Sequence, residues 1–430
     1  MSLLTEPPFS LAGAAGPTGA GRSAESRSFT ASGGFAALER ATSRHEAPLA
    51  VLSLPALQHN TADLLRRAAG KPIRVASKSL RSRDMLRAVL AVPGFRGILA
   101  YALPEALWLA EEFDDVLLAY PSTDRAALTE LAGSASARER VTLMVDSLEH
   151  LEFLRDFATA GAPLRLCLDL DASLRLASGR VHLGMRRSPV HSPDEAEALS
   201  TEIASRPWFR LVGVMSYEGQ IAGLGDDTGS WANRVQMRAL RSFSAFELAG
   251  RRQDAIAAVQ AALARAGAPA LEFVNGGGTG SFETTGREEC VTELAAGSGL
   301  YGPGLFDGYR SFRPQPAAFF ALPVVRRPAP GFVTVLGGGW AASGPAGRDR
   351  LPLPVWPTGL HLLDREGAGE VQTPLQGPAA DTLRPGDKVW FRHAKAGELL
   401  EHVTTVHMVD GDELVATIPS YRGEGKAFLG

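Results

Sequence analysis

The sequence has little cysteine, little excess charge and no long apolar run. Its 430 residues include two cysteines, Cys167 and Cys290, which are too few for a disulfide framework or a cysteine-rich metal cluster. The formal net charge of -3 provides no basic excess to neutralise a phosphate backbone. No apolar run could cross a bilayer, and the N-terminus lacks the pattern of a secretory signal. We therefore expect a cytoplasmic globular protein without a nucleic-acid or membrane partner.

The first 45 residues differ in composition from the rest of the chain. Residues 5–30 are rich in Gly, Ala, Ser and Pro, and such a segment buries too little apolar surface to offset the entropy lost on ordering. Residues 35–43 have the pattern of a short helix. We expect a mobile tail with a short helix over residues 1–45.

From residue 46 to 310, strand-like apolar runs alternate with helix-like stretches. The expected strands are 51–54, 73–76, 97–100, 115–119, 141–145, 164–170, 211–214 and 271–274. The expected helices are 57–68, 82–92, 104–112, 124–131, 148–158, 193–205 and 237–266. This alternation predicts a parallel sheet, and about eight strands favour a closed α/β barrel of the (β/α)8, TIM-like type. An open doubly wound sheet is the alternative.

Residues 311–430 follow a different pattern. Short β-like runs at 324–325, 332–335, 388–391, 403–409 and 414–418 are separated by Gly and Pro turns and show no strong helical period. We expect a C-terminal all-β domain.

One lysine stands at the end of an apolar run, in Pro72-Ile73-Arg74-Val75-Ala76-Ser77-Lys78-Ser79. A lysine that ends a buried strand must shed water from its ammonium group, which lowers its pKa and favours Schiff-base chemistry. In a barrel the active site lies at the carboxyl ends of the strands, where Lys78 would be. The alternative is a surface lysine in a strand-to-helix loop.

Two glycine clusters follow late in the predicted barrel. The first, residues 275–281, contains Gly277, Gly278 and Thr279, whose backbone amides and hydroxyl could approach an anion. The second, residues 297–302, contains Gly299 and Tyr301. Such a pair resembles the phosphate site formed by the last loops of a barrel. A flexible glycine loop is the alternative interpretation of the first cluster.

Two further groups of polar residues follow predicted strands. Tyr217 and Glu218 offer a phenol and a carboxylate where a cofactor could lie, unless each is a satisfied polar group at a strand end. Residues 392–398 include His393 and Lys395, in either a functional cluster or a solvated turn. A His-x-Cys or His-x-Asp pair would suit a divalent metal, but the ammonium of Lys395 repels one. We therefore expect no metal site, and the alternative is a metal held by His393 with a distant residue such as His361.

The order of these motifs resembles that of the fold-type III pyridoxal 5'-phosphate (PLP) enzymes of the alanine racemase N-terminal-domain superfamily. Within it, the chain is most similar to the D-threonine aldolase and D-serine dehydratase group, especially amino acid deaminase/aldolases. The likeness covers about residues 48 to 430. The motifs that carry it are residues 74–78, 217–219 and 276–279, Glu293 with Gly297 and Tyr301, and 385–387 leading into His393.

The resemblance implies a set of cofactor-binding residues. Lys78 would hold PLP as a Schiff base, with Tyr217 beside it. The residues implied around the cofactor phosphate are Gly277, Gly278, Thr279, Gly299 and Tyr301. Alanine racemases have an arginine at the pyridine nitrogen where this chain has Ala295, which favours lyase chemistry over strict racemisation. The metal-dependent relatives carry His-x-Asp or His-x-Cys where this chain has His393-Ala394-Lys395.

The function implied is a PLP-dependent lyase that acts on a small β-hydroxy amino acid, by aldol cleavage or by dehydration. His393 would be the base at the β-hydroxyl, and Lys395 the cationic acid that a metal supplies elsewhere. Alternatives are an amino-acid racemase and a non-catalytic PLP-binding protein. The resemblance also implies a homodimer, since relatives build the site between two subunits.

Overall fold

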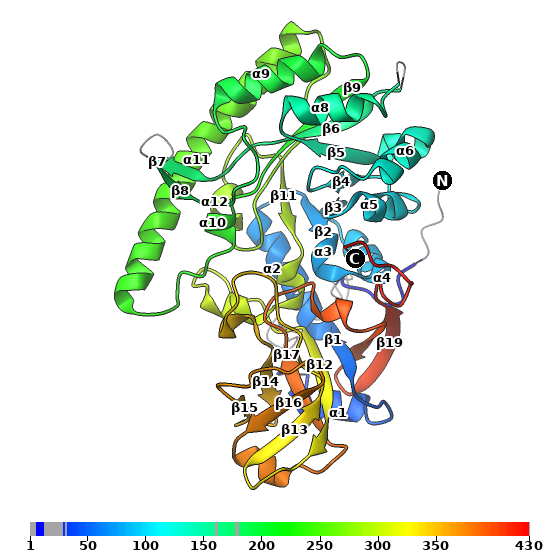
Figure 1. Ribbon diagram of the computed structural model, residues 1–430, viewed down its shortest axis with the longest axis vertical. Helices are drawn as coiled ribbons and strands as arrows, with labels where there is room; N and C mark the ends of the chain where they lie inside the picture. Colours follow the sequence, from blue (N-terminus) through cyan, green and yellow to red (C-terminus); the bar gives the residue numbers. More distant parts are fainter. Residues whose placement is uncertain (1–5, 13–28, 31, 160–161, 177–179, 430) are drawn as a thin grey trace, which may run out of the picture.

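The computed structural model describes residues 6–12, 29–30, 32–159, 162–176 and 180–429. A barrel surrounded by helices forms the upper part of the molecule in Figure 1, and a sheet-rich region lies below it. Both ends of the chain contribute to the lower region, as described below.

The barrel is closed and its eight strands are parallel, which confirms the predicted TIM-like fold and shows that the open-sheet alternative is wrong. The strands run in the order β10 (Phe273–Gly276), β11 (Glu293–Ala296), β2 (Ile73–Ala76), β3 (Phe95–Ala100), β4 (Val116–Leu118), β5 (Val141–Val145), β6 (Leu164–Asp169) and β9 (Phe209–Ser216). Their carboxyl ends therefore meet at one mouth.

Alternation of side chains along each strand sorts residues between the barrel interior and the helical layer. In β6, Leu166 and Leu168 pack in the main core with the helices, whereas Cys167 belongs to a separate inner cluster with Met144 and Phe273. Asp169 is two residues after Cys167 on the same strand, so its side chain also faces the barrel interior.

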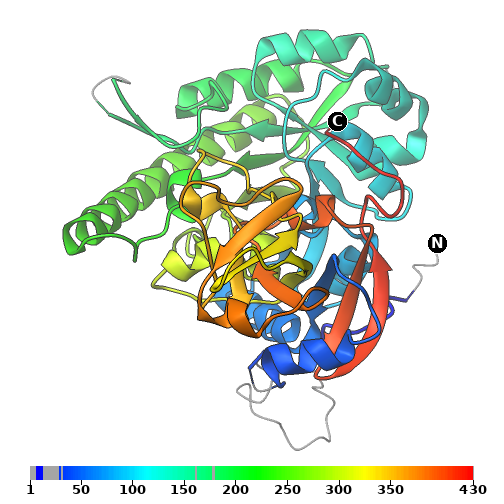
Figure 2. The ribbon, with the colours of Figure 1, turned by 60° about the horizontal axis from the view of Figure 1, so that its bottom comes forward.

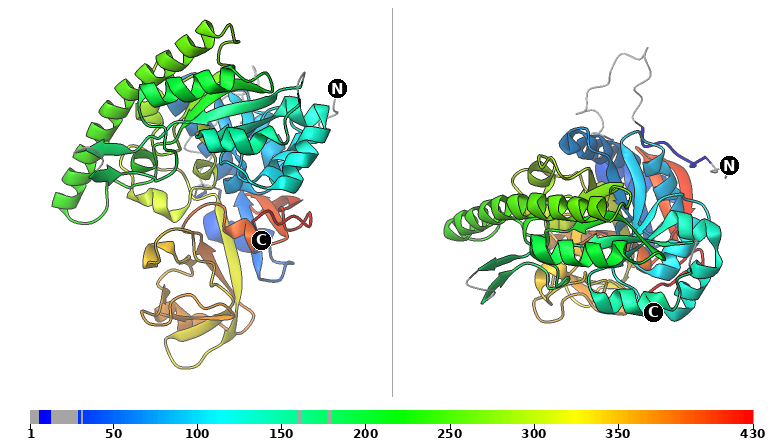
Figure 3. Two further views of the ribbon diagram at one scale, coloured as in Figure 1. Left: turned by 45° about the horizontal axis from the view of Figure 1, so that its top comes forward. Right: turned by 90° about the horizontal axis from the view of Figure 1, so that it is seen from above.

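Helices cover the outside of the barrel in both views of Figure 3. The helices of this part of the chain, including single turns at the ends of strands, are α2 (Leu54–Ala68), α3 (Ser77–Leu80), α4 (Arg83–Leu90), α5 (Leu103–Ala110), α6 (Arg125–Gly133), α7 (Ala135–Arg140), α8 (Leu148–Arg155), α9 (Pro193–Ala204), α10 (Gly219–Ala222), α11 (Trp231–Arg265), α12 (Phe282–Thr285) and α13 (Ser298–Tyr301). A hairpin of β7 (Leu174–Leu176) and β8 (Val181–Leu183) follows β6. Within the described ranges, no helix combines the length and apolar character needed to span a bilayer.

The second sheet confirms the predicted sheet-rich C-terminal region. Its strands are β12 (Ala318–Arg326), β13 (Phe332–Leu336), β14 (Leu353–Trp356), β15 (His361–Leu362), β16 (Gln372–Gln376), β17 (Lys388–Arg392), β18 (Thr405–Asp410) and β19 (Glu413–Pro419), together with β1 (Leu49–Ser53). Short 3-10 turns span Gly304–Gly308, Arg348–Arg350, Pro378–Thr382 and Leu399–Glu401.

The strand expected at residues 51–54 therefore does not belong to the barrel. It is β1, which pairs antiparallel with β12 and parallel with β18. The eighth barrel strand is β11, which the sequence did not reveal because it is short and begins with a glutamate. Glu293 faces the barrel interior, where Arg74 on β2 neutralises it through contacts of 2.6 and 3.1 Å.

The N-terminal segment is partly packed. Residues 1–5, 13–28 and 31 of the expected tail lie outside the described residues. Within 6–12, Phe9 and Leu11 are buried in the main core, which the composition did not predict. Helix α1 (Gly34–Ala41) forms where the short helix was expected.

The segment after β19 turns back from the sheet to the barrel, as the red trace in Figure 2 shows. Glu424 pairs there with Arg83 of α4. The Tyr421 amide donates a 2.8 Å hydrogen bond to the Arg81 carbonyl, just after α3. The last strand of the sheet is thus fastened to the barrel mouth.

Candidate active site

Lys78 lies at the barrel mouth, in the single turn of α3 that follows β2. Its neighbours Ser77 and Ser79 are buried, whereas the Lys78 side chain is exposed. The residue as a whole is therefore more exposed than its neighbours at this strand end. The turn is held by the Arg81 Nε, which donates to the Lys78 carbonyl at 3.0 Å, and by the Tyr301 hydroxyl, which donates to the Leu80 carbonyl at 3.0 Å.

Two other polar side chains lie close to Lys78. Burial alone would raise the pKa of the Tyr120 phenol, but the cations Lys78 and Arg187 lower it below its usual value. Burial lowers the pKa of Lys395, and repulsion by Lys78 lowers it further. The structure thus brings Lys395, from the second sheet, to the same mouth as Lys78.

Arg187 lies between two phenols. Its guanidinium carbon is 5.2 Å from the centre of the Tyr120 ring and 5.2 Å from the centre of the Tyr217 ring, within the range of cation–π contacts. Next to it, burial raises the pKa of the Asp169 carboxyl to about 7, against the attraction of Arg187.

Sequence reasoning missed both Tyr120 and Arg187. Tyr120 comes two residues after β4, so inspection of the positions after each strand would have found it. Arg187 lies beyond the β7–β8 hairpin, and no spacing rule places a residue across such an insertion.

The first glycine loop follows β10. Gly277 has φ +82°, which an L side chain rarely adopts. A Cβ on Gly278 would lie 3.0 Å from both the Ala222 Cβ and the Tyr217 ring. The loop therefore requires glycine in order to lie against Tyr217.

Glu218 supports this loop from below. It is fully buried, and its carboxylate accepts hydrogen bonds from the Gly277 amide at 3.2 Å and from the Ser281 hydroxyl at 2.8 Å. Thr285 donates to it as well, and Arg252 pairs with it at 3.0 Å. The sequence left two interpretations of Glu218: a carboxylate beside a cofactor, or a polar group satisfied by its own chain at a strand end. These hydrogen bonds support the second.

The second glycine cluster meets the first. The Gly299 amide donates to the Thr279 hydroxyl at 3.2 Å, and a Cβ on Gly299 would lie 2.6 Å from the Thr279 methyl carbon. The amides of Thr279, Gly280 and Ser298 find no acceptor among the described residues. Free backbone donors of this kind suit an anion.

Tyr301 and His393 lie behind the Lys78 turn. Tyr301 is fully buried, and its hydroxyl donates its hydrogen bond to the Leu80 carbonyl. The His393 ring is 6.5 Å from the Tyr301 ring, centre to centre, and its Nδ1 is 3.2 Å from the Ala318 carbonyl. Its Nε2 has no partner within the part of the chain that the structure describes. Burial lowers the pKa of His393 to about 3, so the ring is neutral near pH 7.

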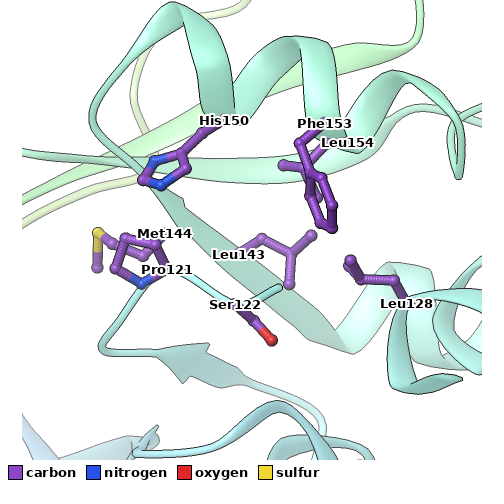
Figure 4. Close-up of a pocket in the computed structure, with 8 residues that line it drawn as sticks. All are labelled: Pro121, Ser122, Leu128, Leu143, Met144, His150, Phe153 and Leu154. Carbon is purple, nitrogen blue, oxygen red and sulfur yellow. The ribbon is translucent and has the colours of Figure 1, made fainter. Parts of the chain in front are cut away.

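Two hollows of the structure lie away from this mouth. A small apolar pocket on the outside of the barrel, between β5, α6 and α8, is shown in Figure 4. A cavity of about 340 Å³ at the amino ends of the strands is lined by charged side chains, among which Arg74 pairs with Glu293 and Asp115. The first offers no cluster of charged groups to an anion. In the second, carboxylates pair with three of the four lining arginines, Arg74, Arg140 and Arg165.

Metal-ligating side chains do not gather at the mouth. Over the described residues, no three His, Cys, Asp or Glu side chains form a group that could hold a metal ion. Lys395, two residues after His393, donates to the Ser343 hydroxyl at 3.2 Å.

Comparison with known proteins agrees with this geometry. The family model of the alanine racemase N-terminal domain matches residues 52–304. A D-threonine aldolase from Arthrobacter sp. is 26% identical over 244 residues, which is 55% of this chain and 56% of that protein. The chain thus spans little more than half the length of this relative.

Solved structures share the fold over nearly the whole chain. The crystal structure of D-threonine aldolase from Filomicrobium marinum matches with a TM-score of 0.68 and 20% identity, over 88% of this chain and 95% of that one. D-threo-3-hydroxyaspartate dehydratase from Delftia sp. HT23 matches with a TM-score of 0.65 and 21% identity, over 87% and 97%.

Proposed function

Because this chain belongs to the family of the alanine racemase N-terminal domain, we propose that it is a PLP-dependent lyase that acts on a β-hydroxy amino acid. The observation that carries the proposal is the meeting of Lys78 with two glycine loops at one barrel mouth. The printed activities of the similar proteins, a D-threonine aldolase and a D-threo-3-hydroxyaspartate dehydratase, support this substrate class.

The residues present fit PLP. The exposed amine of Lys78 is available for a Schiff base, and the amides of Thr279, Gly280 and Ser298 are available for the phosphate. When bound, PLP supplies a ring that accepts the electrons released at Cα of the substrate. Side chains at Gly278 or Gly299 would collide with Tyr217 or Thr279 and close this cradle.

Charged groups around the mouth suit an amino acid. Lys395 and Arg187 supply positive charge for the substrate carboxylate or for an oxygen on which negative charge develops. We assign Lys395 as the acid at the β-hydroxyl in dehydration. His393, whose Nε2 has no partner among the described residues, is the candidate base for the hydroxyl proton in aldol cleavage, and the burial that lowers its pKa makes it a weak one.

A racemase is the second candidate. The observation that favours it is Tyr120, whose phenol lies beside Lys78 and has a lowered pKa. Racemisation needs one proton carrier on each face of Cα, and Lys78 and Tyr120 could form such a pair.

We also propose that the protein works in the cytoplasm as a homodimer. Both cysteines are free, and Cys167 is buried inside the barrel, which suits a reducing compartment. A closed two-fold pair is the commonest assembly of soluble homo-oligomers.

Incubation with each enantiomer of threonine and serine tests the function. A lyase releases acetaldehyde and glycine from threonine by aldol cleavage, or ammonia and an oxo acid from either substrate by dehydration. A racemase releases neither and instead interconverts the enantiomers, which chiral chromatography detects. Absence of all of these products, with cofactor bound, would overturn the proposal for threonine and serine and favour the non-catalytic PLP-binding alternative.

A further inference from the structure

The hollow at the amino ends of the barrel strands, which we call the amino-end cavity, lies at the end of the barrel opposite to Lys78. Its volume is about 340 Å³, and cavities that hold small molecules begin at roughly 300 Å³. Four arginines and five carboxylates are among its lining residues. The charges that these side chains leave unpaired decide which class of molecule the cavity suits.

The most buried arginine of the cavity is fully satisfied by its own chain. The Arg74 side chain is 2% exposed, and an arginine has five N–H donors. Two of them meet Glu293 at 2.6 and 3.1 Å, two meet Asp115 at 2.7 and 3.0 Å, and the fifth donates to the Ile98 carbonyl at 3.4 Å. Arg74 therefore has no donor left for a ligand.

Two further arginines of the cavity are paired within its wall. Arg165 meets Glu272 at 2.6 Å, and Arg140 meets Asp114 at 3.1 Å. Arg210, which stands outside the lining, also pairs with Glu272, at 2.5 Å. Each of these carboxylates therefore already faces a cation, and each of these cations already faces a carboxylate.

Two charged side chains of the cavity remain. Arg96 is the second residue of β3, and Glu139 lies near the end of α7, just before β5. Both residues are exposed, and neither forms an ion pair within the ranges of the chain that the structure describes. The amino-end cavity thus keeps one cation and one anion for a molecule from solution.

Arg96 and Glu139 are close enough to bind one small molecule together. Strand β4 alone separates β3 from β5 in the barrel. Neighbouring strands lie about 4.8 Å apart, so the two backbone positions are about 10 Å apart. Both side chains are long, and both line the same cavity. A molecule that contacts both must therefore carry opposite charges a few bonds apart.

The two free charges argue against other classes of ligand. An inorganic anion would be attracted by Arg96 and repelled by Glu139, and a metal ion would meet the reverse. A polyanion such as nucleic acid requires an excess of positive charge, whereas carboxylates outnumber arginines in this lining. A zwitterion matches both free groups, and free amino acids are small molecules of that kind.

We propose that the amino-end cavity binds a small zwitterion of the free amino acid class, with the carboxylate of the ligand at Arg96 and its ammonium group at Glu139. The site is separate from the mouth that holds Lys78 and the two glycine clusters. The proposal therefore does not depend on the proposed function.

A zwitterion that cannot react at the mouth tests the site. In N,N-dimethylglycine the ammonium group is tertiary, so it cannot form a Schiff base with PLP. Titration calorimetry of the full chain with this probe should show one saturable site. Acetate and trimethylammonium each carry only one of the two charges and should bind at least about tenfold more weakly. Equal affinity for acetate would contradict the role of Glu139.

Substitutions at the two free charges place the binding in the cavity. Arg96→Ala and Glu139→Ala should each raise the dissociation constant of N,N-dimethylglycine about tenfold or more, and both residues are exposed, so neither change disturbs the core. Arg44→Ala and Glu130→Ala remove exposed charges that do not line the cavity and should leave the constant unchanged. Absence of saturable binding, or a constant that either cavity variant leaves unchanged, would overturn the proposal.

Discussion

The Tyr421 phenol donates a 2.9 Å hydrogen bond to the Glu105 carboxylate, although 316 residues of chain separate the two side chains. Both are fully buried. Glu105 also accepts the Tyr101 amide at 2.7 Å, and the Tyr421 amide binds the Arg81 carbonyl at 2.8 Å. The segment after β19 therefore holds α5 and the turn that carries Lys78 in fixed positions.

The first prediction concerns the pH dependence of stability. Burial raises the pKa of Glu105 to about 7 from its ordinary 4.5. The folded chain then binds more protons than the unfolded chain between these values, so stability falls as the pH rises through this window and levels off above it. The contribution is at most about 3 kcal/mol. Denaturant unfolding at several pH values should show that the free energy of unfolding falls as the pH rises, and that this fall is smaller in Glu105→Gln. An equal fall in both proteins would contradict the prediction.

The second prediction concerns the buried carboxylate below the first glycine loop. Glu218→Gln removes a charge that faces the fully buried Arg252, and breaking a buried pair costs about 3 kcal/mol. Glu202→Gln, in the more exposed pair with Arg206, should cost less than about 1 kcal/mol. Denaturant titrations of both variants measure the difference, and equal costs would show that Glu218 does not support the loop.

The third prediction concerns the cradle formed by the two glycine clusters. Gly299→Ala would place a Cβ 2.6 Å from the Thr279 methyl carbon, and overpacking of this kind costs about 1–3 kcal/mol. We expect PLP affinity, measured by absorbance titration, to fall about tenfold or more. Gly250→Ala, at an open site in α11, should leave affinity unchanged and is the matched control. Unaltered affinity in Gly299→Ala would remove this glycine from the site.

The fourth prediction separates Lys395 from a metal-dependent mechanism. A cation about 4 Å from a divalent ion opposes its binding by roughly 8 kcal/mol at an effective dielectric near 20. We expect activity to survive a chelator, and Lys395→Ala to lower turnover more than cofactor affinity. Steady-state kinetics and absorbance titration measure the two effects. Activity that a chelator abolishes and a divalent metal restores would show that the repulsion argument is wrong.

The barrel could be predicted from the sequence because its strands and helices alternate with distinct periods. The pattern could not show which sheet each strand joins. The run at residues 51–54 looks like a barrel strand, yet β1 pairs with β12, more than 250 residues away. Strand β11 was missed because it is short and begins with Glu293, and only the tertiary contact with Arg74 makes that position suitable.

The site could be predicted only where its residues follow strands. Lys78 and the two glycine clusters are local signals of this kind. The position of Arg187 between two tyrosines depends on a hairpin insertion, and the approach of Lys395 to Lys78 depends on how the second sheet meets the barrel mouth. Neither is encoded in a short stretch of sequence.

The most direct test of the central claim is to locate the amine that binds the cofactor. The purified protein, loaded with PLP and treated with borohydride, should be yellow before reduction and should carry a covalent adduct on the peptide that contains Lys78, as identified by mass spectrometry. Lys78→Ala should carry no adduct there, while Lys395→Ala should retain it. An adduct on Lys395 or on any other lysine in the unaltered protein, or a full adduct in Lys78→Ala, would contradict the assignment of Lys78 as the residue around which this site is built.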